Sequence, residues 1–306
     1  MSFSQDVKLE LLGCEAKARH CKIAALCAVV NLCGFYETEK EENNFLVVSS
    51  EHESVAELTS SLILDLTGEK YDVTPFDNRP SIVLIGDKAL SLLALTGFTE
   101  KYSLRAEEPI NPLVVASECC ARTYLRTAFI CCGSVTNPDK SYHFEYVNND
   151  YYHALNIKQL MSRFGIEAKL IERKNHYVVY LKEGEQIADM LKIISATRAL
   201  MEYENRRIVK DVRNNVNRKV NCETANLNKV VSASVKQRQA IEYIESTVGL
   251  DYLSIQLKAA AQARLDYPDL SLKELGEMLK PPVGKSGINH RLKKICEIAQ
   301  QLKGEN

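Results

Sequence analysis

The sequence has no long apolar run, which excludes the usual way for a helix to cross a membrane. No segment approaches the roughly 18 consecutive apolar residues that a spanning helix needs, although 45% of the 306 residues are hydrophobic. The first residues, MSFSQDVKLELLG, lack the basic-then-apolar order of a secretory signal peptide. We therefore expect a cytoplasmic protein with no membrane partner, whose length favours two or three domains.

Cysteine pairs at metal-ligand spacing are also missing. The ten cysteines include no CxxC pair, whereas a structural zinc site is typically built from such a pair and a second ligand pair. In a chain without an export signal we expect reduced thiols rather than disulfides. We predict no metal and no cofactor. We assign to the core the cysteines with apolar neighbours, where Cys packs as a small hydrophobe: Cys27, Cys33, Cys119, Cys120, Cys131, Cys132 and Cys296.

Net charge is small overall because two regions of opposite sign cancel. The whole chain carries −1, but residues 1–100 hold 8 basic and 16 acidic side chains. Residues 201–306 hold 18 basic and 13 acidic side chains. An acidic N-terminal third followed by a basic C-terminal third predicts a nucleic-acid-binding module at the C-terminal end.

An internal repeat fills the first two thirds of the chain. Each copy reads helix, strand or hairpin, helix, two strands, helix. The first copy runs from CKIAALCAVVNLCG to DKALSLLALTG, and the second from RTYLRTAFICCG to GEQIADMLKIISA. We predict an α+β fold in which the copies pack about a pseudo-two-fold axis through helices rich in small residues. Two unrelated α+β domains are the alternative.

Four glycines keep the two copies in register. Gly34 and Gly133 are 99 residues apart, and Gly68 and Gly165 are 97 apart. Each glycine follows a predicted helix, in the place where a left-handed residue commonly ends one. We expect all four to be left-handed caps.

Two of the repeated helices resemble a known motif. LCAVVNLCG (26–34) and LRTAFICCG (125–133) are similar to degenerate copies of the LAGLIDADG motif of homing endonucleases. In that family an acidic residue at the eighth motif position binds the catalytic metal, and the matching positions here are Cys33 and Cys132. A neutral thiol is a poor ligand for a hard divalent cation. The resemblance therefore implies the scaffold and argues against the nuclease.

The composition changes after residue 200, where a basic segment without Pro or Gly predicts a linker helix over 201–220. Its cations are candidates for additional phosphate contacts: Arg206, Arg207, Lys210, Arg213, Arg218 and Lys219. A helix whose charges only keep it solvated explains the same pattern equally well.

A helix-turn-helix pattern lies near the C-terminal end. Ser271 and Glu274 form a capping-box pattern ahead of a short apolar stripe, and KPPVG (280–284) must break that helix. A second helix is predicted to start near Lys285 or Ser286 and to bury Ile288, Leu292, Ile295 and Ala299.

The face opposite that stripe is basic. Residues 280–294 contain five basic side chains and no acidic one. In this motif the start of the second helix reads base edges, while basic neighbours hold phosphates. We predict base contacts from Ser286, Asn289 and His290. Phosphate contacts are expected from Lys285, Arg291, Lys293 and Lys294. A helix-turn-helix that binds protein remains an alternative.

Three further stretches extend the resemblance over nearly all of the chain: KNHYVVYLKEGEQIADMLKIISA, VRNNVNRKVNCETANLNKVVSAS and LSLKELGEMLKPPVGKSGINHRLKKICEIA. The sequence is identified as similar to the WhiA family of bacterial sporulation and cell-division regulators. The resemblance implies a transcription regulator with a nuclease-derived N-terminal domain and a C-terminal helix-turn-helix. One departure is Gly284, at a position where a hydroxyl would cap the second helix.

We therefore expect a pseudo-two-fold duplicated LAGLIDADG-like domain followed by an all-helical helix-turn-helix domain. The expected boundaries are 1–105 and 106–200 for the repeats, 201–220 for the basic linker helix and 221–306 for the DNA-binding domain. The expected function is sequence-specific binding of double-stranded DNA at the nucleoid without catalysis, with other transcription proteins as partners of the N-terminal domain. A metal-dependent DNA endonuclease and an RNA-binding, maturase-like protein are the alternatives.

Overall fold

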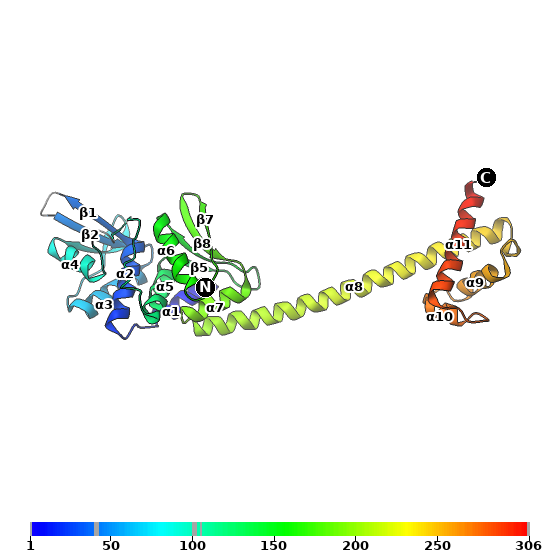
Figure 1. The fold of residues 1–306 in the computed structure, drawn as a ribbon, viewed down its shortest axis with the longest axis horizontal. Coiled ribbons are helices and arrows are strands. Elements are labelled where there is room, and N and C mark those ends of the chain that lie inside the picture. Colours follow the sequence, from blue (N-terminus) through cyan, green and yellow to red (C-terminus); the bar gives the residue numbers. More distant parts are fainter. Residues whose placement is uncertain (1, 40–42, 100–102, 105, 305–306) are drawn as a thin grey trace. The chain divides into compact units, whose positions relative to one another are not determined.

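Two copies of one element order make up the first part of the chain. The structure is a computed structural model that describes residues 2–39, 43–99, 103–104 and 106–304 (Figure 1). The first copy comprises α2 (Arg19–Cys33), β1 (Gly34–Glu39), β2 (Asn43–Ser49), α3 (Glu53–Thr67), β3 (Thr74–Phe76), β4 (Arg79–Ile85) and α4 (Asp87–Leu95). The second comprises α5 (Glu118–Cys132), β5 (Gly133–Val135), β6 (Phe144–Asn148), α6 (Tyr151–Ser162), β7 (Lys169–Arg173), β8 (His176–Leu181) and α7 (Gly184–Ile193).

The two sheets have the same topology. Each has four antiparallel strands, in the order β1-β2-β4-β3 in the first copy and β5-β6-β8-β7 in the second. Equivalent strands therefore occupy equivalent places. In each copy, the long first helix is followed directly by an edge strand of the sheet. This arrangement confirms the duplicated α+β fold predicted from the repeat.

The two repeats meet along α2 and α5, which lie side by side (Figure 1). Small side chains allow the close approach: Ala24, Ala28 and Ala121 are fully buried. Across this contact Asn31 donates a hydrogen bond of 3.2 Å to the Tyr124 hydroxyl. An additional N-terminal helix, α1 (Phe3–Leu12), packs three apolar side chains into the same core. One continuous core thus joins the two copies.

The four repeat glycines have two different roles. Gly68 and Gly165 have φ near +77°, so the predicted left-handed cap is confirmed at both. It is wrong at Gly34 and Gly133, where the backbone is extended and passes straight from helix into strand. A Cβ would lie 2.2 Å from the Val30 carbonyl oxygen at Gly34 and 2.3 Å from the Phe129 ring at Gly133. These two positions need glycine for space, not for a left-handed backbone.

The chain divides into an N-terminal unit, Met1–Asp211, and a C-terminal unit, Val212–Asn306. Helix α8 (Thr197–Thr247) runs through both expected boundaries of the linker, at 200 and at 220. Its first turns belong to the N-terminal core, where Ala199 and Tyr203 are buried. In the C-terminal unit it is followed by a 3-10 turn (Leu250–Tyr252), α9 (Ile255–Asp266), α10 (Leu272–Glu277) and α11 (Lys285–Gly304).

The C-terminal unit has its own core. Ile241 and Ile244 from the end of α8 pack with apolar side chains of α9, α10 and α11. Arg264 of α9 is also buried, and its guanidinium donates to the carbonyl oxygens of Leu270 at 2.9 Å and Pro268 at 3.3 Å. Those bonds hold the loop before α10 against α9, since a buried cation requires such partners.

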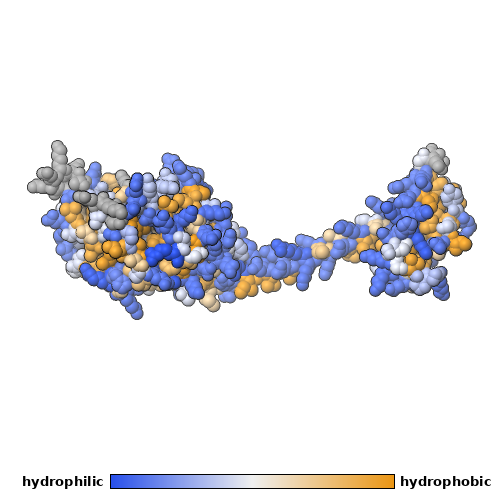
Figure 2. All heavy atoms as spheres, viewed as in Figure 1, coloured by the Kyte–Doolittle hydropathy of each residue, from blue (hydrophilic) through white to orange (hydrophobic). Residues whose placement is uncertain are grey.

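Much of α8 is exposed, and one of its faces is apolar. Ile208, Val212, Val216, Val220 and Leu227 are each more than half exposed, at spacings of four or seven residues, which lie on one face of a helix. Figure 2 shows hydrophobic side chains interspersed with polar ones along this helix. The described residues of this chain leave that face uncovered.

Candidate nucleic-acid interface

Helix α11 has one buried and one exposed face, as predicted. Ile288, Leu292, Ile295 and Ala299 are buried against α9 and α10. The exposed predicted contact residues are Lys285, Ser286, Asn289, His290, Lys293 and Lys294. Arg291 is half-buried, because it lies beside the apolar stripe, immediately before Leu292. The structure thus gathers the six exposed residues on the first three turns of one helix.

Little on α11 neutralises its basic residues. Lys293 lies 3.9 Å from Glu297, one turn along the exposed surface, which is a weak pairing. Within the described ranges, no ion pair within 4.0 Å involves Lys285, Arg291 or Lys294. The N-terminal half of α11 therefore presents cations that are free to meet phosphates.

Helix α10 is capped at its start, and the turn that joins it to α11 is tight. Ser271 and Glu274 form the predicted capping box, with the Ser271 hydroxyl accepting from the Glu274 N–H. The Val283 N–H donates to the Gly276 carbonyl oxygen at 2.9 Å. A Cβ on Gly276 would lie 2.1 Å from the Val283 oxygen, so only glycine fits there. This contact joins α10 to the last residues before α11 and fixes where α11 begins.

The predicted cations of α8 fall into two groups. Arg206 pairs with Asp139 and Glu202, Arg207 pairs with Glu204, and the Lys210 ammonium donates to the Pro138 carbonyl oxygen and lies over the Tyr142 ring. These three are engaged inside the N-terminal unit. The other three, Arg213, Arg218 and Lys219, are exposed and have no ion pair within the part of the chain that the structure describes.

The helix ends that hold the metal in homing endonucleases carry a different set of groups here. Cys33 ends α2 and Cys132 ends α5, and both are half-buried. A hydrogen bond from Cys131 lowers the pKa of Cys33, whereas burial raises the pKa of Cys132 to about 12. The Lys8 ammonium is close enough to both thiols to interact electrostatically with them. Thiols beside a cation do not fit a hard divalent metal, which prefers oxygen ligands.

A buried polar network lies close to these helix ends. The Tyr124 hydroxyl is 2.7 Å from His153 Nε2, and His153 Nδ1 is 3.1 Å from Asn148 Oδ1. Burial lowers the pKa of His153 to about 3, so this histidine is neutral at ordinary pH. Nδ1 then donates to Asn148 while Nε2 accepts from Tyr124. His153 and Asn148 line a cavity of about 1020 Å³ together with Asn31 of the first repeat.

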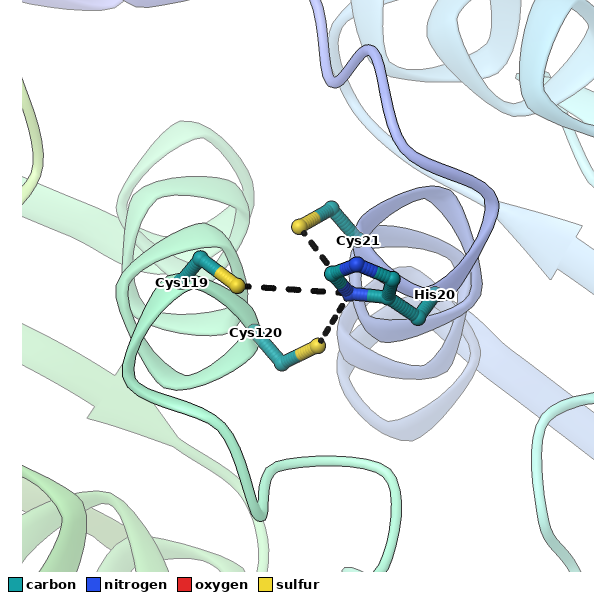
Figure 3. Close-up of side chains that lie close together, drawn as sticks. All are labelled: His20, Cys21, Cys119 and Cys120. Atoms are coloured by element: carbon teal, nitrogen blue, oxygen red, sulfur yellow. Dashed lines mark hydrogen bonds between the residues drawn. The ribbon is translucent and has the colours of Figure 1, made fainter.

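The predicted packing of the cysteines is only partly correct. Cys27 and Cys120 are buried, and Cys33, Cys131, Cys132 and Cys296 are half-buried, but Cys119 is exposed. Cys119 is the second residue of α5, where it faces the start of α2 rather than the core (Figure 3). There it lies with His20, Cys21 and Cys120. Sequence spacing missed this grouping, because two of the four residues come from each repeat.

No helix in the described ranges combines the length and the apolarity that crossing a bilayer requires. This agrees with the lack of long apolar runs in the sequence.

Known proteins resemble both units of the chain. A family model described as the WhiA LAGLIDADG-like domain matches residues 121–213, and one described as the WhiA C-terminal HTH domain matches residues 216–299. A crystal structure of full-length DUF199/WhiA from Thermatoga maritima superimposes with a TM-score of 0.58 at 26% identity, covering 98% of this chain and 99% of that one.

Curated relatives match over the full length. A probable cell division protein WhiA from Thermoanaerobacter sp. (strain X514) is 43% identical, covering 99% of this chain and 98% of the relative. One of the same description from Lachnoclostridium phytofermentans is 40% identical, covering 99% of this chain and all of the relative. Because such identity extends through both the duplicated unit and the helix-turn-helix, the chain belongs to the WhiA family.

Proposed function

We propose that this chain is a sequence-specific, double-stranded DNA-binding transcription regulator that acts in cell division, chromosome segregation or sporulation. The observation that carries the proposal is the exposed face of α11, which follows a capped helix and a tight turn and presents several cations without an acidic side chain before Glu297. The relatives are named as cell division proteins, and the matching C-terminal family model is a helix-turn-helix.

The roles on α11 divide by position. Ser286, Asn289 and His290 are exposed near its start, where a recognition helix contacts base edges. An asparagine can bond bidentately to adenine, which contributes roughly 1–3 kcal/mol of discrimination. Lys285, Lys293 and Lys294 are assigned to phosphates, together with Arg291, whose half-buried side chain lies at the edge of the exposed face. Arg213, Arg218 and Lys219 of α8 are proposed as additional phosphate contacts.

The N-terminal unit, in this proposal, neither cleaves DNA nor supplies most of its binding. Cleavage in the endonuclease family needs metal-binding carboxylates at the positions where this chain has Cys33 and Cys132. The positively charged Lys8 ammonium lies near the same two thiols, where it would repel a metal cation. Residues 1–100 carry twice as many acidic as basic side chains, and such a surface repels phosphates. We assign this unit to contacts with other transcription proteins.

The test compares two α11 variants on a site identified by genome-wide mapping. Asn289→Ala is expected to lose affinity for that site by about 5- to 150-fold, the equivalent of 1–3 kcal/mol, with little change on a scrambled duplex. Lys294→Ala is expected to weaken both duplexes alike and to reduce the salt slope by about one unit. Fluorescence anisotropy across a salt series measures both effects.

Arg206→Ala is the matched control, because Arg206 is already paired with two carboxylates. It should leave the salt slope unchanged. Equal losses on both duplexes for Asn289→Ala would remove that residue from the base-reading set, and unchanged binding in both α11 variants would refute the assigned surface. Stronger competition by structured RNA than by duplex DNA would favour the RNA-binding alternative. Magnesium-dependent cutting of the bound site would establish a nuclease.

A further inference from the structure

The N-terminal ends of α2 and α5 bring four metal-ligating side chains together. Those of His20 and Cys21 come from α2, and those of Cys119 and Cys120 come from α5 (Figure 3). Their ligand atoms all lie within 4.8 Å of one another. This cluster lies at the opposite ends of the helices from Cys33 and Cys132, so it is distinct from the position of the endonuclease metal.

The cluster follows the symmetry of the repeat. His20 and Cys119 are each the second residue of their helix, and Cys21 and Cys120 are each the third. Both pairs are 99 residues apart, the same separation as Gly34 and Gly133. Packing two equivalent helices about the axis therefore places two ligands from each repeat together. No CxxC spacing is needed, because each repeat supplies two adjacent ligand residues.

The distances suit a tetrahedral metal ion. His20 Nδ1 lies 3.1 Å from Cys120 Sγ, 3.4 Å from Cys21 Sγ and 4.0 Å from Cys119 Sγ. Bonds of about 2.0 Å to nitrogen and 2.3 Å to sulfur put neighbouring N and S ligands about 3.5 Å apart and S and S ligands about 3.8 Å apart in a tetrahedron. The three observed distances from His20 Nδ1 to sulfur lie on both sides of the ideal N–S separation of about 3.5 Å. Cys119, the most distant of the three sulfurs, is exposed.

The cluster is partly buried and lies at the N-terminal ends of two helices. Cys21, Cys120 and Ala24 form a small buried cluster, with Ala16 and Ala18 packed against it. The ends of both helices carry partial positive charge, which stabilises an anionic sulfur. A bound dication would replace the protons of all three thiols.

We propose that His20, Cys21, Cys119 and Cys120 bind one zinc ion in a closed Cys₃His site that crosslinks the two repeats. Three thiolates and one imidazole are typical ligands of structural zinc, and four protein ligands leave no open position for catalysis. Each zinc–sulfur bond replaces an S–H bond, so binding releases three protons to the solvent. The ion holds the starts of α2 and α5 together and stabilises the duplicated unit.

The test uses the full chain, purified under reductant without air and stripped of metal with a chelator. Titration with Co²⁺ is expected to give one equivalent of tetrahedral, thiolate-bound cobalt, seen as visible d–d bands and a sulfur-to-cobalt charge-transfer band. Zn²⁺ should bleach this spectrum. X-ray absorption of the zinc form should show three sulfur ligands at about 2.3 Å and one nitrogen at about 2.0 Å.

Cys119→Ser removes one ligand at an exposed position, and Cys222→Ser is its matched control, since Cys222 is also exposed but lies on α8. Cys119→Ser should weaken zinc binding by more than the roughly 10- to 100-fold that loss of an outer-shell partner costs. It should also abolish the zinc-dependent rise in the thermal midpoint. His20→Ala should behave likewise, with an unchanged far-ultraviolet circular dichroism spectrum in all three variants.

Three outcomes would overturn the proposal. The first is the absence of a stoichiometric cobalt spectrum from the wild-type chain. The second is equal zinc affinity in Cys119→Ser and Cys222→Ser. The third is a disulfide between these cysteines in protein kept under reductant, detected as a mass two units lower and a loss of titratable thiols.

Discussion

Replacing Gly276 with alanine is expected to loosen the turn that presents α11. A Cβ at residue 276 would lie 2.1 Å from the Val283 carbonyl oxygen and 3.2 Å from its carbonyl carbon. Both are backbone atoms and cannot rotate away. Because ordinary contact begins near 3.4 Å, the Val283 peptide must move by about 1.3 Å, which strains its hydrogen bond to Gly276. Overpacking of this kind costs roughly 1–3 kcal/mol.

Hydrogen exchange, measured by mass spectrometry on the full chain, reports the expected loss of local stability in α11. A cost of 1–3 kcal/mol corresponds to about 5- to 150-fold faster exchange of the α11 amides, and affinity for every duplex should fall with it. Gly284→Ser is the matched control, because a Cβ there meets no atom within 4 Å. Its new hydroxyl should cap α11 and leave exchange unchanged or slightly slower. Wild-type exchange rates in Gly276→Ala would refute the assigned role of this turn.

Three further predictions test the cores of the two units. Burial holds the folded-state pKa of His153 near 3, below the ordinary 6.5, so the stability from the neutral ring is present above pH 6.5 and is lost as the pH falls toward 3. Between about pH 7 and pH 5, the free energy of unfolding measured in urea should fall by roughly 2 kcal/mol more in the wild type than in His153→Gln. An equal fall in both proteins would contradict this. Gly34→Ala and Gly133→Ala should each lower the thermal midpoint of the N-terminal unit, since the added Cβ would lie only 2.2 Å or 2.3 Å from its nearest atom. Gly13→Ala is the control and should not lower it, because a Cβ there would lie 3.4 Å from its nearest atom. Arg264→Met leaves two loop carbonyls without their cationic partner and should destabilise the C-terminal unit by roughly 1.5–3 kcal/mol in urea, with partial rescue by Arg264→Lys; equal stability of all three would show that these bonds contribute nothing.

The sequence by itself determined the features that depend on local spacing. The two residues of the capping box, Ser271 and Glu274, are only three positions apart, and the buried stripe from Ile288 to Ala299 repeats at helical intervals. The duplicated element order was visible for the same reason, since each helix and strand carries its own hydrophobic period. The resemblance to the WhiA family followed from extended stretches of the chain, and the full-length relatives confirm it.

Only the tertiary structure decided which distant side chains meet. Arg206 looked like a free cation until the fold placed Asp139, 67 residues away, against it. Cys119 looked like a core residue until α5 packed beside α2 and turned it toward His20. Gly34 and Gly133 looked like left-handed caps because their need for glycine comes from the atoms around them, which spacing along the chain does not describe. Contacts between repeats depend on how helices pack in three dimensions, so local pattern alone could not predict the cysteine and histidine cluster.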